Sequence, residues 1–370
     1  MDNIRPKVIV AVVAFAVALV VSLWAIPGLS ATSAATAASS TGSQGDSMAG
    51  MAGMSSDSGS TSSDASSSDA SGATDWKTMM NKMKANDESF PAKTQGLGGQ
   101  PLLPTKILPD GTKVFHLTTE VVKKWEVSPG KFVEAWTYNG MVPGPTISLN
   151  VGDKVQIIVK NELPEPTTIH WHGLPVPNNM DGVPFMNQDP IIPGATFTYK
   201  FTAKAPAVSW YHSHYDADKQ ITNGLYGMIL IGHMKVPAGV HVDQTYNMEL
   251  MDSGNIGLSI NGKSFPATQE VKEPLNGWLE VNYMGAGNLS HPMHLHGMNQ
   301  LVIAEDGSPV PKPYEVNTLL VSPGQTFTVL VHATLPGTWA WHCHILDHSE
   351  GPNGMFGIVT ALNVYKPKAA

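Results

Sequence analysis

Short runs of alternating apolar and polar residues, separated by glycine and proline turns, fill the chain from about residue 103 to residue 367. Val155, Ile157 and Val159, for example, alternate along one such run. A period of two indicates a β-strand with one buried face. No stretch of helical period is long enough for a βαβ unit, so the pattern predicts an all-β protein of sandwich or barrel architecture.

An internal repeat sets the number of domains. The sequence PGATFT at 193–198 leads to WYHSH at 210–214, and PGQTFT at 323–328 leads to AWHCH at 340–344. Both elements are displaced by the same 130 residues, as the numbering shows directly. The repeat therefore predicts two homologous β domains, and the length leaves no room for a third.

We expect these domains at 103–236 and 237–370. An Asn-Gly turn signal with a proline after it recurs in both, at 139–140 and 261–262. Each predicted domain also contains an earlier histidine cluster that follows a strand. The two copies therefore differ in detail but share one plan.

The first hundred residues do not resemble a globular domain. Arg5 and Lys7 precede an unbroken apolar run over 8–26, which predicts a signal peptide or an N-terminal membrane anchor within residues 1–30. We therefore expect export to the periplasm or the extracellular space, with or without anchoring. Residues 31–102 are rich in Ser, Ala, Gly and Met, which predicts a flexible linker.

Two groups of methionines lie in this N-terminal region. They are Met48, Met51 and Met54, then Met79, Met80 and Met83. Thioethers are soft ligands that favour Cu(I), so both groups are candidates for copper handling. The alternatives are an ordinary low-complexity linker for the first group and a short amphipathic helix for the second.

Charge and cysteine content narrow the function. The formal net charge is -8, which argues against nucleic acid or an anionic membrane surface as a partner. The single cysteine of an exported chain cannot form an internal disulfide. Metal ligation is then the obvious role for it.

Ten of the fourteen histidines fall into four short clusters. The clusters are HWHG at 170–173, HSH at 212–214, HPMHLHG at 291–297 and HCHILDH at 342–348. Histidines at positions i and i+2 of a strand point to the same face, so each pair can hold metal from one side. The pattern predicts several metal ions close together.

Cys343 stands between two histidines of the last cluster. A thiolate with His348, the remote His291 and a nearby methionine forms the ligand set of a blue-copper electron-transfer site, and Met355 is the best axial candidate. Eight histidines remain, enough for three further coppers in a three-three-two arrangement. They are His170, His172, His212, His214, His294, His296, His342 and His344.

These motifs, in this order, resemble those of the multicopper oxidases, the laccase family built from cupredoxin domains. The similarity covers roughly residues 105–365 and includes NGMVPGP at 139–145. It implies two cupredoxin-like Greek-key domains and four coppers per chain, one type 1, one type 2 and two type 3. It also implies that O2 and a small reducing substrate are the partners in the reaction.

The resemblance assigns each ligand by motif. His170 and His294 would hold the type 2 copper. One type 3 copper would be held by His172, His212 and His344, and the other by His214, His296 and His342. The type 1 copper would be held by His291, Cys343, His348 and Met355.

Two carboxylates are candidate proton carriers. Asp181 matches the acidic residue that the family places near the trinuclear cluster, although a plain turn residue in Asp181-Gly182 is the alternative. Glu350 is the second candidate, but Ser349 stands where many relatives have a glutamate.

The axial position also departs from the family, because Asn353 stands where the methionine is usual and Met355 comes two residues later. An asparagine ligand or a vacant axial position is the alternative there.

The first domain carries Ser213 where the second has Cys343, so only the second can hold a type 1 copper. In this respect the chain resembles the two-domain laccases. That resemblance implies a homotrimer in which the first domain of one subunit meets the second domain of its neighbour, with the trinuclear clusters at the subunit interfaces.

Several functions fit these features to different degrees. Oxidation of phenolic or aromatic donors comes first, and oxidation of Cu(I) or another metal ion in copper homeostasis is the alternative. A copper nitrite reductase shares the architecture but needs fewer histidines and carries its blue site in the first domain. A copper storage protein needs no ordered path from a cysteine to a cluster, whereas this chain provides one.

Overall fold

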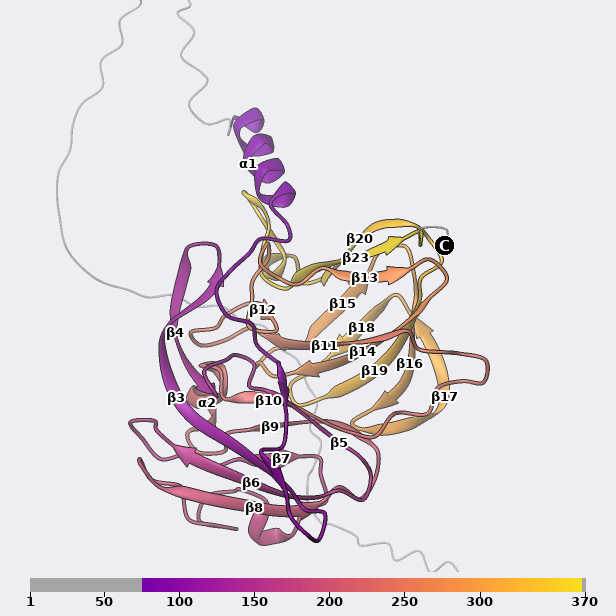
Figure 1. Cartoon of the computed structure of the whole chain (residues 1–370). Coiled ribbons are helices and arrows are strands. Elements are labelled where there is room, and N and C mark those ends of the chain that lie inside the picture. Colours follow the sequence, from indigo (N-terminus) through magenta and orange to yellow (C-terminus); the bar gives the residue numbers. More distant parts are fainter. Residues whose placement is uncertain (1–74, 368–370) are drawn as a thin grey trace, which may run out of the picture. The chain divides into compact units, whose positions relative to one another are not determined.

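Strands dominate the computed structural model, which describes residues 75–367. The predicted signal or anchor at 1–30 and the Met48/Met51/Met54 group lie outside the described residues. Within the described part of the chain, no helix has the length and apolar character needed to cross a membrane. Residues 75–367 contain two α-helices, α1 (Trp76–Glu88) and α2 (Ala217–Thr222) (Figure 1).

The first half of the described chain forms two packed sheets. One has the strand order β1-β5-β10-β9-β7; the other has the order β2-β3-β6-β8, with β4 paired to β3. The bounds are β1 (Pro101–Leu102), β2 (Lys106–Ile107), β3 (Lys113–Ser128), β4 (Lys131–Tyr138), β5 (Thr146–Leu149), β6 (Lys154–Asn161), β7 (His170–His172), β8 (Thr196–Thr202), β9 (Ala207–His212) and β10 (Tyr226–Ile231).

The second half repeats this construction. Its sheets have the orders β12-β11-β14-β19-β16-β17 and β13-β23-β20-β15-β18, and β21 and β22 form a separate hairpin. The bounds are β11 (Gln244–Met251), β12 (Ser259–Ile260), β13 (Val271–Pro274), β14 (Trp278–Gly285), β15 (His291–Leu295), β16 (Gln300–Glu305), β17 (Ser308–Val316), β18 (Thr318–Val321), β19 (Thr326–His332), β20 (Gly337–Cys343), β21 (Glu350–Gly351), β22 (Gly354–Met355) and β23 (Val359–Tyr365).

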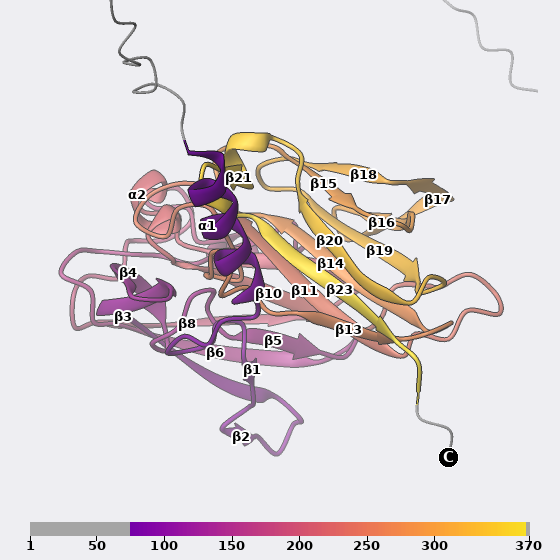
Figure 2. The same cartoon turned by 90° about the horizontal axis from the view of Figure 1, so that it is seen from above.

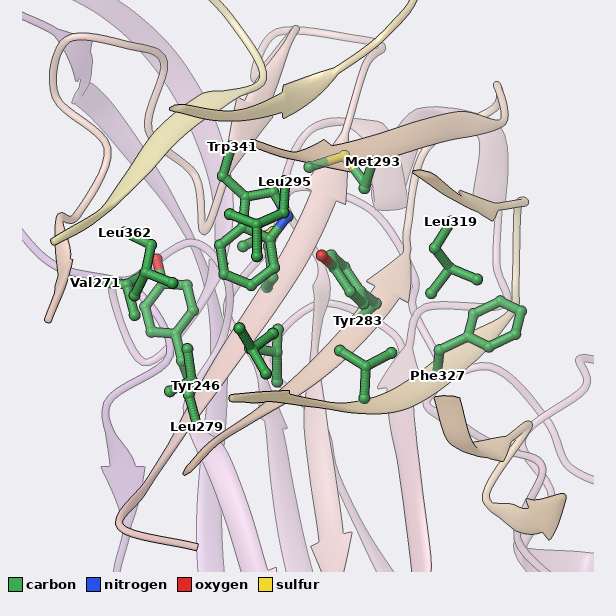
Figure 3. Close-up of a cluster of buried hydrophobic side chains, with 14 of the residues drawn as sticks. Tyr246, Val271, Leu279, Tyr283, Met293, Leu295, Leu319, Phe327, Trp341 and Leu362 are labelled. Carbon is green, nitrogen blue, oxygen red and sulfur yellow. The ribbon is translucent and has the colours of Figure 1, made fainter. Parts of the chain in front are cut away.

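Alternating side chains build the core of each half. Along β6, Val155, Ile157 and Val159 are buried as the sequence pattern predicted. In the second half, Trp341 and Leu295 pack beside Met293 and Tyr283 in the core (Figure 3). Trp171 of β7 and Trp341 of β20 are both fully buried, and each belongs to a strand that carries histidines.

The repeat seen in the sequence is also a repeat of conformation. Asn139 and Asn261 both have positive φ, 54° and 52°, and each is followed by a glycine with positive φ. The side-chain oxygen of Asn139 accepts the N–H of Thr118, and that of Asn261 accepts the N–H of Glu249. The predicted fold class, two cupredoxin-like domains, is confirmed.

A shared junction joins the two halves within one compact unit. Trp125 of β3 donates its indole N–H to the carbonyl oxygen of Gly262, and Thr326 of β19 donates to the carbonyl oxygen of Val208. The Lys263 ammonium lies 4.1 Å from the centre of the Trp125 ring. A cluster of buried apolar residues from both halves fills the space around these contacts.

Residues 75–102, the last part of the predicted linker, contain regular structure. Asp75 caps the N-terminus of α1 by accepting the N–H of Lys77. Further on, β1 pairs in parallel with β5 of the first sheet. The linker prediction was based on low apolar content. It could not include these contacts, because they are made by a helix cap and by backbone pairing.

Candidate metal centre

A sulfur-centred site lies in the second half, where β15, β20 and the turn after β20 meet. The Cys343 Sγ lies 3.6 Å from His291 Nδ1 and 3.8 Å from His348 Nδ1. All three side chains are buried, and their ligand atoms lie within 4.8 Å of one another. Two imidazole nitrogens converging on one cysteine sulfur fit a trigonal copper site.

Burial decides the protonation of this site. It raises the pKa of the Cys343 thiol to about 11, and it lowers the pKa of His348, with the nearby His291 acting in the same direction. Both shifts favour the uncharged forms, a neutral thiol on Cys343 and a neutral imidazole on His348. Cys343 would hold a metal as the thiolate, because coordination deprotonates a thiol.

Asp252, at the end of β11, orients one of these ligands. Its Oδ2 accepts a hydrogen bond of 2.9 Å from His291 Nε2, which leaves Nδ1 free to face the sulfur. Both side chains are fully buried. A carboxylate that holds the far nitrogen of a ligating histidine fixes the ring and its tautomer.

Four histidines form a first cluster on β7, on β9 and two residues beyond β9. The ring of His170 lies 5.6, 5.3 and 5.5 Å from the rings of His172, His212 and His214, measured between centroids. His172 Nδ1 and His212 Nε2 are 3.4 Å apart. We call these four residues the first half-site.

Four more histidines form the equivalent cluster on β15, on β20 and at the residue that follows each of these strands. The ring of His294 lies 4.7, 5.8 and 5.6 Å from the rings of His296, His342 and His344. The Nε2 atoms of His296 and His342 are 3.1 Å apart. We call these four residues the second half-site; His296 and His344 are exposed to solvent.

Strand pairing explains why both half-sites form. His170 pairs with His212 across β7 and β9, and His294 pairs with His342 across β15 and β20. Directly opposed residues of an antiparallel pair point to the same face, and so do residues two apart along a strand. Each HxH motif therefore adds its two rings to the rings of the opposing strand.

Backbone carbonyl oxygens fix the tautomer of four of these rings. His170 donates its Nδ1–H to the carbonyl oxygen of Asp181, His212 to that of Ser213, and His342 to that of Cys343. The donor–acceptor distance is 2.8 Å in each case. His294 donates its Nδ1–H to Asn317 over 3.1 Å. Each of these rings keeps the Nε2 lone pair free for a metal.

The pKa values of the half-site histidines also suit metal binding. Burial lowers the pKa of His212 to about 3, and burial followed by neighbouring histidines lowers the pKa of His172, His296 and His342. Only a neutral imidazole has a lone pair to offer, so these rings are ready to coordinate at neutral pH.

The two half-sites remain separate within one chain. Ring contacts join the members of each half-site, and within residues 75–367 no ring contact joins the first half-site to the second. The groups of ligand atoms that lie close enough for one metal also stay within one half. The three-copper cluster predicted from the sequence would need both half-sites together.

The first domain replaces the sulfur site with a hydrogen-bonded trio. Ser213, the counterpart of Cys343, lies 3.2 Å from Thr167 and donates to Gln220 over 2.6 Å. Thr167 donates to the same Gln220 oxygen over 2.8 Å. All three side chains are buried. The first domain thus has a hydrogen-bonded hydroxyl at the repeat position where the second domain has its sulfur.

Asp181 contacts the first half-site through its backbone as well as its carboxylate. Its carboxylate oxygen lies 3.4 Å from His170 Nδ1, but the shorter contact is made by its carbonyl oxygen. Gly182 follows with φ +89°, and a Cβ there would lie 1.9 Å from the carbonyl oxygen of Ile169. The Asp-Gly turn therefore brings Asp181 to His170, and the proton-carrying role of Asp181 stays a prediction.

Met355 and Glu350 lie opposite each other in the β21–β22 hairpin that follows His348. Glu350 is exposed. The Met355 carbonyl oxygen accepts a hydrogen bond of 2.7 Å from Asn86 of α1, and its N–H lies 3.3 Å from Asp87 Oδ1. The axial role of Met355 and the proton role of Glu350 stay predictions.

Three residues that hydrogen-bond to candidate ligands were not singled out from the sequence. Asp252 lies 39 positions before His291, and Asn86 and Asp87 lie in the predicted linker. None belongs to a histidine motif, so spacing gives no signal for them. Only the folded chain brings them to the ligands.

Comparison with known proteins shows which family has this arrangement of domains. Two family profiles, both described as Multicopper oxidase, match residues 121–235 and 233–362. The blue copper oxidase of Nitrosomonas europaea has a similar structure, with 31% sequence identity and a TM-score of 0.64. That match covers 68% of this chain and 86% of the other.

Curated relatives are longer than this chain. Dihydrogeodin oxidase of Aspergillus terreus is 30% identical over a region that covers 69% of this chain and 48% of that protein. A copper resistance protein A homolog of Pseudomonas syringae pv. tomato is 38% identical, covering 35% of this chain and 22% of that protein. This chain thus spans less than half of either relative.

Proposed function

This chain belongs to the multicopper oxidase family, and on that premise we propose that it is a laccase-like oxidase. It would couple the one-electron oxidation of phenolic or aromatic donors to the four-electron reduction of O2 to water. The observation that carries the proposal is the residue order at the end of β20, where Cys343 of the sulfur site stands between His342 and His344 of the second half-site. One stretch of backbone thus connects the site that would accept electrons with the site that would use them.

We assign four coppers per chain to the ligand sets given by the family resemblance. When bound, they supply single-electron transfer and the reduction of dioxygen. The close pairs support the assignment: His172 and His212 belong to one predicted type 3 set, and His296 and His342 belong to the other. Each set still lacks one ligand, which the resemblance takes from the opposite half-site.

We therefore propose that the half-sites are completed between chains, in a closed homotrimer. The first half-site of one subunit would face the second half-site of its neighbour. Two observations support this arrangement: the half-sites stay separate within one chain, and His296 and His344 are exposed. A head-to-tail contact of this kind has to close into a ring to avoid open filaments.

Carboxylates of the chain itself would transfer the protons of the reaction. Asp181 lies against His170 and would deliver protons at the first half-site. Near the sulfur site, the exposed Asp347 and Glu350 flank His348 on either side. Either could accept the proton that a phenol loses on oxidation, which supports a phenolic donor.

Oxidation of Cu(I) is the second candidate, and the position of α1 favours it. Met79 and Met83 lie on the half-buried side of α1, and the Cα atom of Met83 approaches Gly354 of β22, next to Met355. Thioethers near the electron-accepting site would suit a soft metal substrate. Nitrite reduction stays the least favoured alternative.

We also propose that the protein is exported, because Arg5, Lys7 and the apolar run at 8–26 have the order of an export signal or anchor. Copper loading would then take place outside the cytoplasm. A phenol and Cu(I), assayed side by side with O2 consumption, would rank the two substrate classes.

The main test combines metal content with native mass. We expect four coppers per chain in a three-chain particle with an intense blue thiolate-to-copper band. Replacement of Cys343 by serine should abolish the band and donor oxidation while three coppers per chain remain. A wild-type protein without the band, or a Cys343→Ser variant that keeps full turnover, would refute the proposed function.

A further inference from the structure

Helix α1 lies before both predicted domains, yet it is in contact with the β21–β22 hairpin, which holds the candidate axial ligand. Both views of the structure place α1 beside this hairpin (Figures 1 and 2). No residue of α1 is fully buried, so the helix is not part of a core. Its half-buried residues are Met79, Met83, Asn86 and Asp87.

Two polar side chains of α1 bind both backbone groups of Met355. Asn86 Nδ2 donates to the Met355 carbonyl oxygen over 2.7 Å, and the Met355 N–H lies 3.3 Å from Asp87 Oδ1. Asn86 also donates to Asp87 Oδ1 over 3.0 Å, which orients the pair. We call Asn86 and Asp87 the clamp.

The helix backbone also approaches this hairpin closely. A Cβ at Gly354 would lie 2.9 Å from Asp87 Oδ1 and 3.1 Å from the Cα atom of Met83. Gly354 has φ +102°, a conformation that favours glycine. The residue before Met355 thus has both the shape and the small size that contact with α1 requires.

The end of α1 is fixed to the second domain by an independent set of contacts. Phe90 stacks on Phe265 with ring centroids 5.1 Å apart, and Ala92 donates its N–H to the carbonyl oxygen of Pro266. The same segment holds the chain beyond Met355, because Ser264 accepts the N–H of Gly357 through its hydroxyl oxygen. One loop therefore secures both the helix and the hairpin.

The hairpin needs such support. It has only two residue pairs, and short isolated hairpins are marginal in water. On its other side it adjoins a ligand, because β21 is in contact with the turn Leu346–His348. Movement of the hairpin would change the distance from the Met355 thioether to a copper held by His291, Cys343 and His348.

We propose that α1 belongs functionally to the sulfur site and that Asn86 and Asp87 are positioning residues for Met355. They set how closely the thioether approaches the type 1 copper, and so they tune its reduction potential. This inference rests on the proposed function and on Met355 as the axial ligand. It also accounts for the methionine lying two residues later than the family pattern, since α1 determines where the longer loop sits.

The test uses the full copper-loaded chain and five variants, the last of which combines the first two. Asn86→Ala/Asp87→Ala removes the clamp, and Met355→Leu removes the thioether. Asp87→Asn keeps an acceptor oxygen in place. Lys84→Ala/Glu88→Ala, the matched control, removes an exposed ion pair from the same helix. The readouts are the thiolate-to-copper absorption band and the reduction potential from a redox titration.

We expect the clamp variant to keep the blue band and to shift the reduction potential upward, in the same direction as Met355→Leu. A more weakly bound axial thioether stabilises Cu(II) less, so reduction to Cu(I) becomes easier. Asp87→Asn and the control should match the wild type. Adding the clamp substitutions to Met355→Leu should produce no further shift, since there is no longer a thioether to position.

Three results would overturn the inference. The first is a clamp variant with wild-type band and potential while Met355→Leu is shifted. The second is a further shift when the clamp is removed in the Met355→Leu background, which would show a general effect on the site. The third is a Met355→Leu variant identical to the wild type. In all three cases the blue band of the wild type would still stand, so the proposed function would survive.

Discussion

At the scale of single residues, Asp252 is the strongest support of the sulfur site. Burial would raise the pKa of its carboxyl group, but hydrogen bonds from His291, Ser253 and the N–H groups of Leu289 and Asn288 outweigh burial and lower the pKa to about 2. Asp252 is therefore a carboxylate at neutral pH. Its charge would stabilise Cu(II) at the proposed type 1 site more than Cu(I), since the divalent ion carries the larger charge.

Replacement of Asp252 by asparagine should raise the reduction potential of the type 1 copper and weaken copper binding about 10- to 100-fold, the usual cost of losing such a partner. Redox titration and competition with a chelator measure the two effects. Asp347→Asn is the control, because it removes the same charge from an exposed position beside His348. Equal effects from the two variants would show that charge alone matters and that the hydrogen bond to His291 does not.

At the scale of elements, the turn that follows Asp181 presents two apolar side chains to solvent. Phe185 and Met186 are 79% and 82% exposed. The turn is well hydrogen-bonded, with the Phe185 N–H donating to Gln188 and the Met186 N–H to Val183. Phe185 has φ 62°, a strained conformation for a bulky residue. A fixed apolar tip on the turn that follows Asp181 would suit a contact with the neighbouring subunit of the proposed trimer.

Phe185→Ser/Met186→Ser should therefore weaken assembly. Two apolar side chains that become buried at a contact contribute on the order of 3 kcal/mol together, so dissociation should increase by roughly 100-fold. Native mass against concentration measures it, and the blue band should persist in the separated chains. Leu103→Ser is the control, since Leu103 is 76% exposed on a different segment. A trimer as tight as the wild type would exclude this turn from the interface.

Elements also show how far the sequence could predict the structure. Alternation predicted strands such as β6, and the repeat predicted two copies of one fold, because both depend on local periodicity. The HxH motifs predicted shared faces, since strand geometry fixes side-chain direction. Asn86, Asp87 and Asp252 could not be predicted, because their partners lie far along the chain and their contacts form only on folding.

At the scale of the whole molecule, Lys263 joins the two halves. Its ammonium donates to the carbonyl oxygens of Gln95 and Glu126 and lies over Trp125. Burial lowers its pKa to about 8, although Glu126 acts in the opposite direction. The unfolded chain keeps this proton up to about pH 10.5, so the unfolded state binds more protons between pH 8 and 10.5. Lys263 should therefore make stability rise with pH across that window.

Urea unfolding of the copper-free protein at several pH values tests this prediction. Relative to Lys263→Met, the wild type should gain up to about 3 kcal/mol in free energy of unfolding from pH 8 to pH 10.5. Subtracting the variant removes the contributions of other titrating groups. Lys106→Met, at an exposed strand position, should keep the wild-type dependence. Parallel curves for the wild type and Lys263→Met would mean that the junction does not lower the pKa of Lys263.

The assembly itself can be tested by complementation between inactive chains. A His170→Ala/His172→Ala variant loses the first half-site, and a His294→Ala/His296→Ala variant loses the second. Each alone should be inactive. In a mixed head-to-tail trimer, one of the three interfaces joins the intact first half-site of one variant to the intact second half-site of the other, whichever variant is in excess. That interface also keeps its own Cys343, so electrons can still enter.

Random assembly of equal amounts makes three quarters of the trimers mixed, so about a quarter of all interfaces should be intact and about a quarter of wild-type activity should return. Co-refolding or co-expression provides the mixture, and O2 consumption measures activity. The control pairs His170→Ala/His172→Ala with His212→Ala/His214→Ala. Both lesions then lie in the first half-site, and no interface can be whole. If the first mixture is no more active than the control, each chain must build its cluster without a neighbour, and the assignment of ligands across subunits fails.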